Sequence, residues 1–178
     1  MCALDIRPAI GTERLILRGP VAADAPLIAE LANDLGVAGM TTTIPHPYSQ
    51  ADAEDHLARV ARLNPRAGAE FAIEHRTFGL IGMLGFREEE PRRPQLGYWL
   101  GRPFWGRGYA TEAVRAALDW ARGDWRRGAV WAGHFAENRA SGQVLVKAGF
   151  LYTGDLERKP CAARGGRTMA TRMMVWLA

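Results

Sequence analysis

The chain has 178 residues, 48% of them hydrophobic, with 23 Lys and Arg against 19 Asp and Glu. This composition excludes disordered and coiled-coil chains and predicts one globular domain over residues 1–178. No stretch approaches the roughly 18 uninterrupted apolar residues of a membrane span, and the N-terminal segment lacks the apolar core of an export signal, so we expect neither membrane insertion nor secretion.

Charge and cysteine usage narrow the class of protein further. The formal net charge is +4, but lysine occurs only at Lys147 and Lys159, and the basic residues are scattered. Because no basic stripe alternates with aromatic residues, nucleic-acid binding is not predicted. Cys2 and Cys161 stand at opposite ends, with no CxxC pair and no histidines at ligand spacing. We therefore expect no disulfide framework, no metal, and a reducing, cytoplasmic environment.

Hydrophobic spacing predicts the elements of the first half of the chain. A strand over 12–18 comes first. A helix opened by Asp24 follows, and its apolar face holds Leu27, Ile28, Leu31 and Leu35. Pro45 and Pro47 exclude a regular helix in the segment that contains them. Ser49 then caps a helix that ends before Pro65. Residues 70–75 and 79–86 alternate as two strands of an antiparallel hairpin.

The second half mixes strands and helices. We expect a solvated loop at 88–91, a strand over 96–100, and a helix whose apolar face holds Val114, Ala117, Leu118 and Ala121. A strand over 129–135, a helix from 138 to about 147 and a last strand over 171–177 follow. A meander combined with strand-helix-strand crossovers predicts a three-layer α/β or α+β fold. Trp125 and Trp131 fit either its core or a dimer contact.

A glycine-rich turn, WGRGYATEA at 105–113, stands between a predicted strand and a predicted helix. At such a point the helix dipole and free backbone N–H groups converge, which favours an anion. Gly106 and Gly108 also let a phosphate approach the backbone closely. Thr111 replaces the last glycine of a dinucleotide fingerprint, and no Gly-Lys-Ser/Thr follows, so both familiar phosphate loops are excluded. A phosphate loop and a plain helix-entry turn remain open.

The string GYWLGRPFWGRGYATEA at 97–113 resembles the acyl-CoA-binding motif of the GNAT (Gcn5-related N-acetyltransferase) superfamily, in its RimJ/RimL-like branch. Gly108 and Ala110 match the last two places of the general pattern. Trp105 departs from its first place but is usual in this branch. Asn138, Ser141 and the Lys-x-Gly-Phe at 147–150 are similar to the second signature, and residues 44–48 to an acceptor-side motif.

Counted from TERLILR at 12–18, the resemblance covers essentially the whole chain. It implies a GNAT-type three-layer fold, with a central mixed, mainly antiparallel sheet of six to seven strands and about four helices. It also implies acetyl-CoA as the acyl donor, with the backbone amides of Arg107, Gly108, Tyr109 and Ala110 on its diphosphate. The other residues that it places at the donor are Tyr98, Trp99, Leu100, Arg102, Trp105, Gly106, Thr111, Asn138 and Ser141.

Some of these residues have structural alternatives. Arg102 or Arg107 would screen the diphosphate charge, or lie on ordinary solvated surface. By the resemblance Asn138 bonds the pantetheine arm, but asparagine is also among the best helix N-caps. Ser141 would stand near the sulfur, or satisfy the first turn of its helix.

Acetyl transfer to an amine needs a proton acceptor, an oxyanion donor and a proton for the thiolate. Gln95 stands where many relatives carry a glutamate, and an amide accepts no proton at neutral pH. Water, Glu70, His134 and Glu137 remain as proton acceptors. Leu145 stands where many relatives carry a tyrosine that protonates the thiolate. The Ser141 hydroxyl is the remaining candidate for this proton donor. A backbone N–H on a splayed strand around 98–100 would meet the oxyanion.

The sequence thus predicts an acetyl-CoA-dependent N-acetyltransferase acting by direct attack of an amine in a ternary complex. Its acceptor would be a protein N-terminus or a small-molecule amine, and the chain a monomer or homodimer. A CoA-binding protein without catalysis is the alternative, motivated by Gln95 and Leu145. Fold and donor motif do not specify the acceptor.

Overall fold

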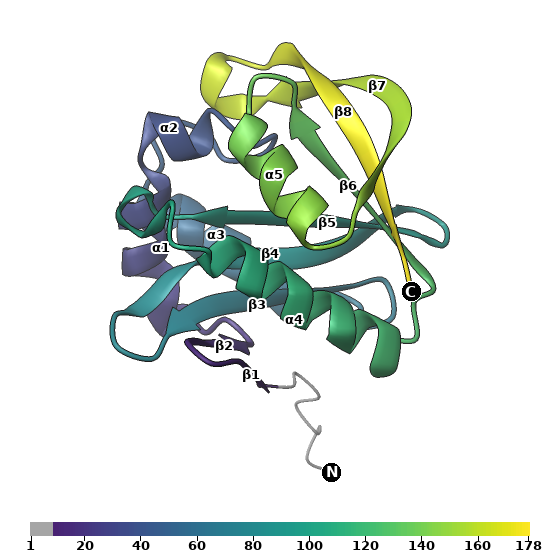
Figure 1. Cartoon of the computed structure of the whole chain (residues 1–178). Helices are drawn as coiled ribbons and strands as arrows, with labels where there is room; N and C mark the ends of the chain where they lie inside the picture. Colours follow the sequence, from purple (N-terminus) through teal and green to yellow (C-terminus); the bar gives the residue numbers. More distant parts are fainter. Residues whose placement is uncertain (1–8) are drawn as a thin grey trace.

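A mixed sheet is the middle layer of the computed structural model, which describes residues 9–178 (Figure 1). Its eight described strands lie in the order β1-β2-β3-β4-β5-β6-β8-β7. They span β1 (Ile10–Gly11), β2 (Leu15–Arg18), β3 (Gly68–His75), β4 (Gly79–Glu90), β5 (Arg93–Leu100), β6 (Ala129–Phe135), β7 (Leu151–Cys161) and β8 (Arg167–Leu177). The pairing is antiparallel except between β5 and β6.

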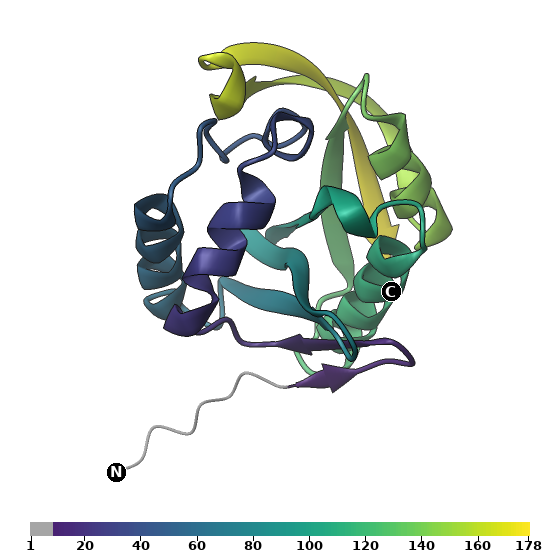
Figure 2. The ribbon, with the colours of Figure 1, turned by 90° about the vertical axis from the view of Figure 1, so that its left-hand side faces the viewer.

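Helices cover both faces of this sheet (Figure 2). The longer ones are α1 (Ala25–Ala32), α3 (Gln50–Ala61), α4 (Tyr109–Gly123) and α5 (Arg139–Lys147), and α2 (Leu35–Ala38) is a single turn. Phe71 and Leu84 belong to the core under α4 and α5, whereas their neighbours Ala72 and Met83 belong to the core under α1 and α3. Successive side chains of a strand therefore point to opposite faces of the sheet and belong to two separate cores.

The predicted three-layer, mainly antiparallel fold is confirmed, but six to seven strands is too low a count. β1 is a two-residue edge strand, and β7 is exposed along residues 151–156, so it lacks the alternation that marks a half-buried strand. The loop expected at 88–91 is also wrong in part. β4 continues through Glu90, which pairs with Arg93, and Arg92 turns the chain with φ 63°.

The first predicted helix is shorter than expected. It ends at Ala32, and Asp34 caps α2 by accepting a hydrogen bond from the Gly36 N–H at 2.7 Å. Leu35 therefore falls in a separate turn and is 54% exposed, and Leu27 is 36% exposed. The buried face uses alanine instead, which lets α1 pack closely on the sheet. Ser49 caps α3 as predicted, since its Oγ accepts from the Asp52 N–H.

β5 and β6 part soon after they meet. Their parallel ladder holds only the pairs Gln95↔Trp131 and Leu96↔Ala132, whereas β5 stays paired with β4 as far as Leu100. Beyond Leu96 the β6-facing edge of β5 therefore runs without a neighbouring strand. A gap opens in the middle of the sheet, between the two helical layers.

Two further expectations concern membrane-spanning helices and disulfide bonds. No helix within residues 9–178 is long and apolar enough to cross a membrane. Cys161 is buried and not in a disulfide, while Cys2 and the rest of residues 1–8 lie outside the described part of the chain.

Candidate active site

A cleft of about 1540 Å³ occupies the gap between β5 and β6. Its walls come from both helical layers: the N-terminal turns of α4 and α5 on one side, and α3 with the β3–β4 hairpin on the other. Because β5 lacks a partner strand here, its backbone N–H groups on this edge face the cleft rather than a ladder. The splayed strand expected around 98–100 is present, and Gly97, Tyr98, Trp99 and Leu100 line the opening.

The glycine-rich turn forms one end of the cleft. Gly106 and Gly108 have φ angles of 72° and 80°, which only glycine adopts without strain. Gly108 is the N-cap of α4 and offers no side-chain cap, and the Glu112 N–H makes a helical bond to its carbonyl at 3.1 Å. The N–H groups of the first turn thus lack helical partners, as at any helix start. Gly106, Gly108, Tyr109, Ala110 and Thr111 line the cleft.

Two predicted donor residues are held by other partners. Arg102 forms a two-pronged ion pair with Asp34, both contacts at 2.6 Å, and its guanidinium lies 5.2 Å from the Trp105 ring centroid. The hydrogen bond from Arg102 lowers the pKa of Asp34 to about 2. Trp105 lines the cleft, and its Nε1 donates to the Leu100 carbonyl at 2.7 Å. Arg102 therefore already has a counter-charge, and its screening of a diphosphate stays a prediction.

The start of α5 brings three predicted residues together. Asn138 caps the helix, because its Oδ1 accepts from the Ser141 N–H at 3.1 Å. The Ser141 Oγ lies 2.8 Å from the Tyr98 hydroxyl, which reaches across from β5. Burial raises the pKa of Tyr98 to about 12 against the opposing hydrogen bond with Ser141, so at neutral pH this phenol keeps its proton. The pair offers two adjacent hydroxyls to the cleft.

His134 lies under the same helix and is only 6% exposed. Its Nδ1 stands 2.8 Å from the Phe135 carbonyl, which can only accept, so Nδ1 carries the proton. Nε2 lies 3.0 Å from the Tyr152 hydroxyl. Both nitrogens therefore have partners within the chain, and the role of His134 as a proton acceptor stays a prediction. Glu137 forms an ion pair with Arg164.

Glu70 reaches the cleft from the opposite face of the sheet, with 8% of its side chain exposed. Its Oε1 lies 2.6 Å from His56 Nε2 on α3, and its Oε2 accepts from Arg87 at 3.2 Å. Burial alone would raise the pKa of this carboxyl. The hydrogen bond and charge of His56, together with Arg87, outweigh that effect and leave the pKa below its usual value. Glu70 is therefore an ionised carboxylate.

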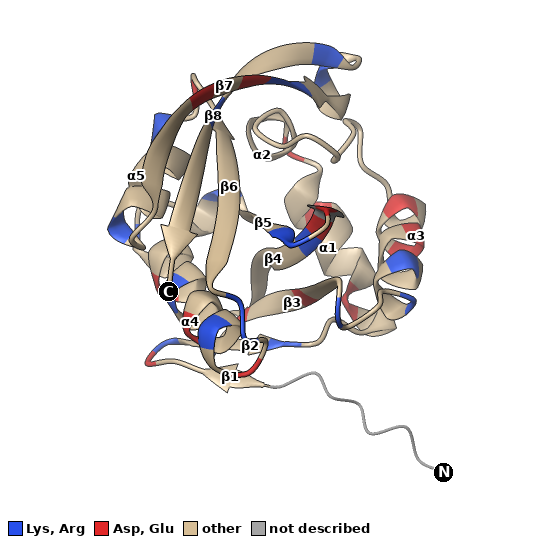
Figure 3. Cartoon of the chain, turned by 90° about the vertical axis from the view of Figure 1, so that its right-hand side faces the viewer, with Lys and Arg blue, Asp and Glu red and all other residues tan. Residues whose placement is uncertain are grey.

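Sequence reasoning missed His56. An ionised carboxylate only accepts, so His56 Nε2 donates to Glu70 and Nδ1 is the ring nitrogen able to take a proton. The only signal in the sequence was its place on α3, directly before Leu57 of the buried face. Beside the pair, burial together with the charges of Asp52 and Glu70 raises the pKa of Tyr48 to about 12. Acidic and basic residues mix along α3, so this wall carries both signs (Figure 3).

The two departures from the family pattern differ in exposure. Gln95 and Leu145 both line the cleft, but Leu145 is also fully buried in the core beneath α5. Within residues 9–178, no group of three or more His, Cys, Asp and Glu side chains is placed to hold a metal ion.

Two of the curated relatives that match this chain in sequence are described as N-acetyltransferases. The "Uncharacterized N-acetyltransferase YoaA" of Bacillus subtilis is 31% identical over 162 residues, which cover 85% of this chain and 87% of the relative. The "Uncharacterized N-acetyltransferase p20" of Bacillus licheniformis is 33% identical over 112 residues, which cover 61% of this chain. The second match spans less than two thirds of p20, 63% of its length.

Solved structures share the fold. The microcin C7 self-immunity acetyltransferase MccE, in complex with acetyl-CoA and AMP, superposes with a TM-score of 0.81 at 17% identity over 94% of each chain. The ribosomal L7/L12 α-N-protein acetyltransferase RimL superposes with a TM-score of 0.80 at 20% identity, over 97% of this chain and 95% of RimL.

The family model "Acetyltransferase (GNAT) domain" matches residues 14–151, a stretch that contains the glycine-rich turn, the parted strands and the start of α5. Sequence match, fold and cleft agree, and the chain belongs to the GNAT acetyltransferases.

Proposed function

We propose that the protein is an acetyl-CoA-dependent N-acetyltransferase that transfers an acetyl group to a primary amine by direct attack in a ternary complex. One observation carries the proposal. A single cleft joins an uncapped helix start behind Gly108 to the His56–Glu70 pair on the other face of the sheet. We therefore propose that donor and acceptor occupy opposite walls of the cleft and meet between β5 and β6.

The donor takes the α4 and α5 side of the cleft. The backbone N–H groups of residues 107–110 hold the diphosphate, as oriented amides at a helix start hold anions. Asn138 bonds the pantetheine arm through its side-chain NH₂, because its Oδ1 is used in the helix cap. The acetyl-CoA complex of MccE, which shares this fold, supports such a donor.

Chemistry follows at the parted strands. The amine nitrogen forms a bond to the thioester carbonyl carbon, and a backbone N–H of residues 98–100 stabilises the oxyanion. Collapse of this intermediate breaks the carbon–sulfur bond, and Ser141 hands a proton to the thiolate and recovers one from Tyr98 or water. His56 Nδ1 takes the proton that the amine loses, and Glu70 stabilises the imidazolium. His134 is the competing proton acceptor.

The acceptor is a primary amine, either a protein N-terminus or a small molecule. The N-terminal choice, and membership of the RimJ/RimL-like branch, are supported by the motif at 97–113 and by the superposition on RimL. Spermidine N-acetyltransferase from Vibrio cholerae, solved with CoA and spermine, has the same fold at 20% identity and supports a small amine as the other class.

Calorimetric titration of the purified protein with acetyl-CoA, desulfo-CoA and ATP tests the donor site. We expect micromolar binding of both CoA compounds and none of ATP; absence of CoA binding would overturn the proposal. Transfer is then assayed with ribosomal N-terminal peptides and with polyamines. CoA binding without turnover on any amine would favour the non-catalytic CoA-binding protein. That alternative is motivated by Gln95 and the buried Leu145, which stand at the expected positions of the proton acceptor and the proton donor.

A further inference from the structure

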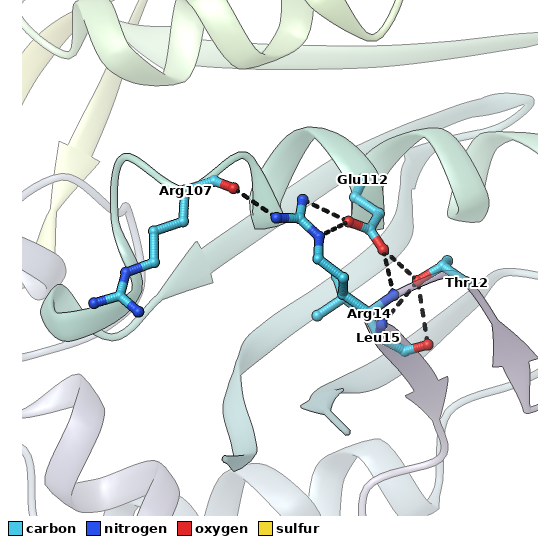
Figure 4. Close-up of polar contacts among 5 residues, drawn as sticks. All are labelled: Thr12, Arg14, Leu15, Arg107 and Glu112. Atoms are coloured by element: carbon cyan, nitrogen blue, oxygen red, sulfur yellow. Dashed lines mark hydrogen bonds and ion pairs between the residues drawn. The ribbon is translucent and has the colours of Figure 1, made fainter. Parts of the chain in front are cut away.

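A polar network ties the N-terminal strands to the glycine-rich turn, although the two segments lie more than ninety residues apart (Figure 4). Its hub is Glu112, in the first turn of α4. Glu112 Oε1 accepts from the Thr12 hydroxyl at 2.7 Å and from the Arg14 N–H at 2.9 Å. Its Oε2 lies 2.7 Å from both Arg14 Nε and Arg14 Nη2. The forked pair fixes the plane of the Arg14 guanidinium.

The remaining nitrogen of Arg14 contacts the turn itself. Arg14 Nη1 donates to the Arg107 carbonyl at 3.0 Å, and the guanidinium lies 4.6 Å from the centroid of the Tyr109 ring. The Arg107 side chain points away from this contact, so only its backbone takes part (Figure 4). Arg14 is therefore hydrogen-bonded to the backbone immediately before Gly108, the N-cap of α4.

The hydrogen bond from Arg14 also determines which way the Gly108 N–H points. The Arg107–Gly108 peptide is trans, so its carbonyl and the Gly108 N–H point in opposite directions. Gly108 lines the cleft on one side and, on the other, a shallow surface groove that also contains Thr12, Arg14 and Glu112. With the carbonyl held on the groove side, the Gly108 N–H is directed to the cleft side.

We infer that Arg14 is a positioning residue for the acyl donor: it fixes the Arg107–Gly108 peptide so that the Gly108 N–H faces the CoA diphosphate. This inference rests on the proposed function. Arg14 does not neutralise the phosphates itself, because Glu112 already balances its charge and its side chain lines the groove rather than the cleft. A preset peptide plane spares the turn the entropy of ordering when the donor arrives.

Arg18 supplies a matched control. It is the last residue of β2, the strand that begins directly after Arg14, and its side chain pairs with two carboxylates, Asp24 at 2.8 Å and Glu74 at 2.5 Å. Its hydrogen bonds go to Gly19, Asp24 and Glu74, and none of these residues belongs to the glycine-rich turn. Arg14→Met and Arg18→Met therefore each remove one structural arginine, and only the first releases the turn.

The experiment measures the Kd of acetyl-CoA by calorimetry for wild type, Arg14→Met, Arg14→Lys and Arg18→Met. We expect Arg14→Met to raise the Kd about tenfold, the loss typical of one charge-assisted hydrogen bond. Arg14→Lys keeps the charge beside Glu112 but not the fork that spans both partners, so a severalfold rise is expected, and it replaces Arg14→Met if that variant does not fold. Arg18→Met should bind as wild type does.

Amide hydrogen exchange separates positioning from general damage. At saturating acetyl-CoA, Arg14→Met should lose donor-induced protection at 106–110 while keeping it at 138–142. An unchanged Kd in both Arg14 variants, or an equal rise in Arg18→Met, would overturn the inference and leave the proposed function standing. Failure of the wild type to bind acetyl-CoA would instead remove the proposed function, and the inference with it.

Discussion

The two walls of the cleft are built by different means. On the wall that we propose for the donor, the groups offered to a ligand are the backbone N–H groups at the start of α4, behind Gly108, and the side-chain NH₂ of Asn138, the cap of α5. On the wall that we propose for the acceptor they are polar side chains, with Glu70 held between His56 and Arg87. Binding by backbone N–H groups depends on chain conformation, and these groups do not titrate. A wall of ionised side chains depends on pH and on which residues the fold brings together.

The largest expected effect is on the acceptor side. His56→Gln removes the proton acceptor but keeps an amide able to reach Glu70, so we expect kcat to fall about 100-fold, a typical general-base contribution. The Kd of acetyl-CoA should not change, because His56 lies on the other wall. Steady-state kinetics at saturating acetyl-CoA measure kcat, and calorimetry measures the Kd.

Glu54→Gln is the control for that experiment, since Glu54 is exposed on the same helix and pairs only locally with Gln50. If His134→Gln lowers kcat and His56→Gln does not, the proton acceptor lies on the α5 side, and the assignment of roles to the two walls is wrong.

Gly108→Val tests the donor wall. The residue has φ 80°, a backbone conformation that a β-branched side chain adopts only with strain, whereas an added Cβ at 3.5 Å from Arg14 Nη2 would make an ordinary contact. We expect the Kd of acetyl-CoA to rise at least about tenfold, since backbone strain of this kind costs roughly 1–3 kcal/mol. Calorimetry provides the measurement.

Gly123→Ala, at the end of the same helix, meets open space and should bind acetyl-CoA as wild type does. Wild-type affinity in a folded Gly108→Val protein would mean that this turn does not hold the diphosphate.

The same contrast explains what could be predicted from the sequence. Each part of the donor wall comes from a short stretch of sequence. Local rules for glycine and asparagine predict the turn at 105–113, the helix that follows it and the Asn138 cap. The sheet was also predictable where strands are half-buried. β7 was missed because exposed residues carry no alternation, and α1 was overextended because Leu35 continues the apolar spacing beyond the break at Asp34.

The acceptor wall could not be predicted in this way. Glu70 was a candidate, but its partner His56 lies on another element, and nothing in the sequence shows that α3 places it 2.6 Å from that carboxylate. The Arg14–Glu112 pair joins residues 98 positions apart and was equally invisible. Tertiary contacts of this kind depend on the register of the sheet, which local spacing does not specify.

Asn138 separates the two roles that sequence reasoning left open. Asn138→Ala loses the cap and should destabilise the protein by about 1 kcal/mol in urea unfolding. Asn138→Asp keeps an oxygen for the Ser141 N–H but has no NH₂ group, so it should retain stability while acetyl-CoA binds severalfold more weakly. Full affinity in a stable Asn138→Asp protein would leave Asn138 as a cap alone.

The smallest expected effect is the dependence of stability on pH. Glu70 has a pKa below its usual value of 4.5, so its ionised form stabilises the fold above that pH. This contribution is lost as pH falls through the lower, folded-state pKa. The stability advantage of wild type over Glu70→Gln should therefore shrink as the pH falls below 4.5. Urea unfolding at each pH measures it.

The stability deficit of Asn138→Ala involves a neutral amide and a backbone N–H, and should stay constant over the same range. If both differences shrank together, the pH dependence would belong to the whole fold, because protonation of many carboxylates weakens all such comparisons alike. If only the Glu70 difference shrinks, the ionised groups that respond to acid lie on the acceptor wall, and the donor wall keeps its backbone geometry while the acceptor wall changes charge.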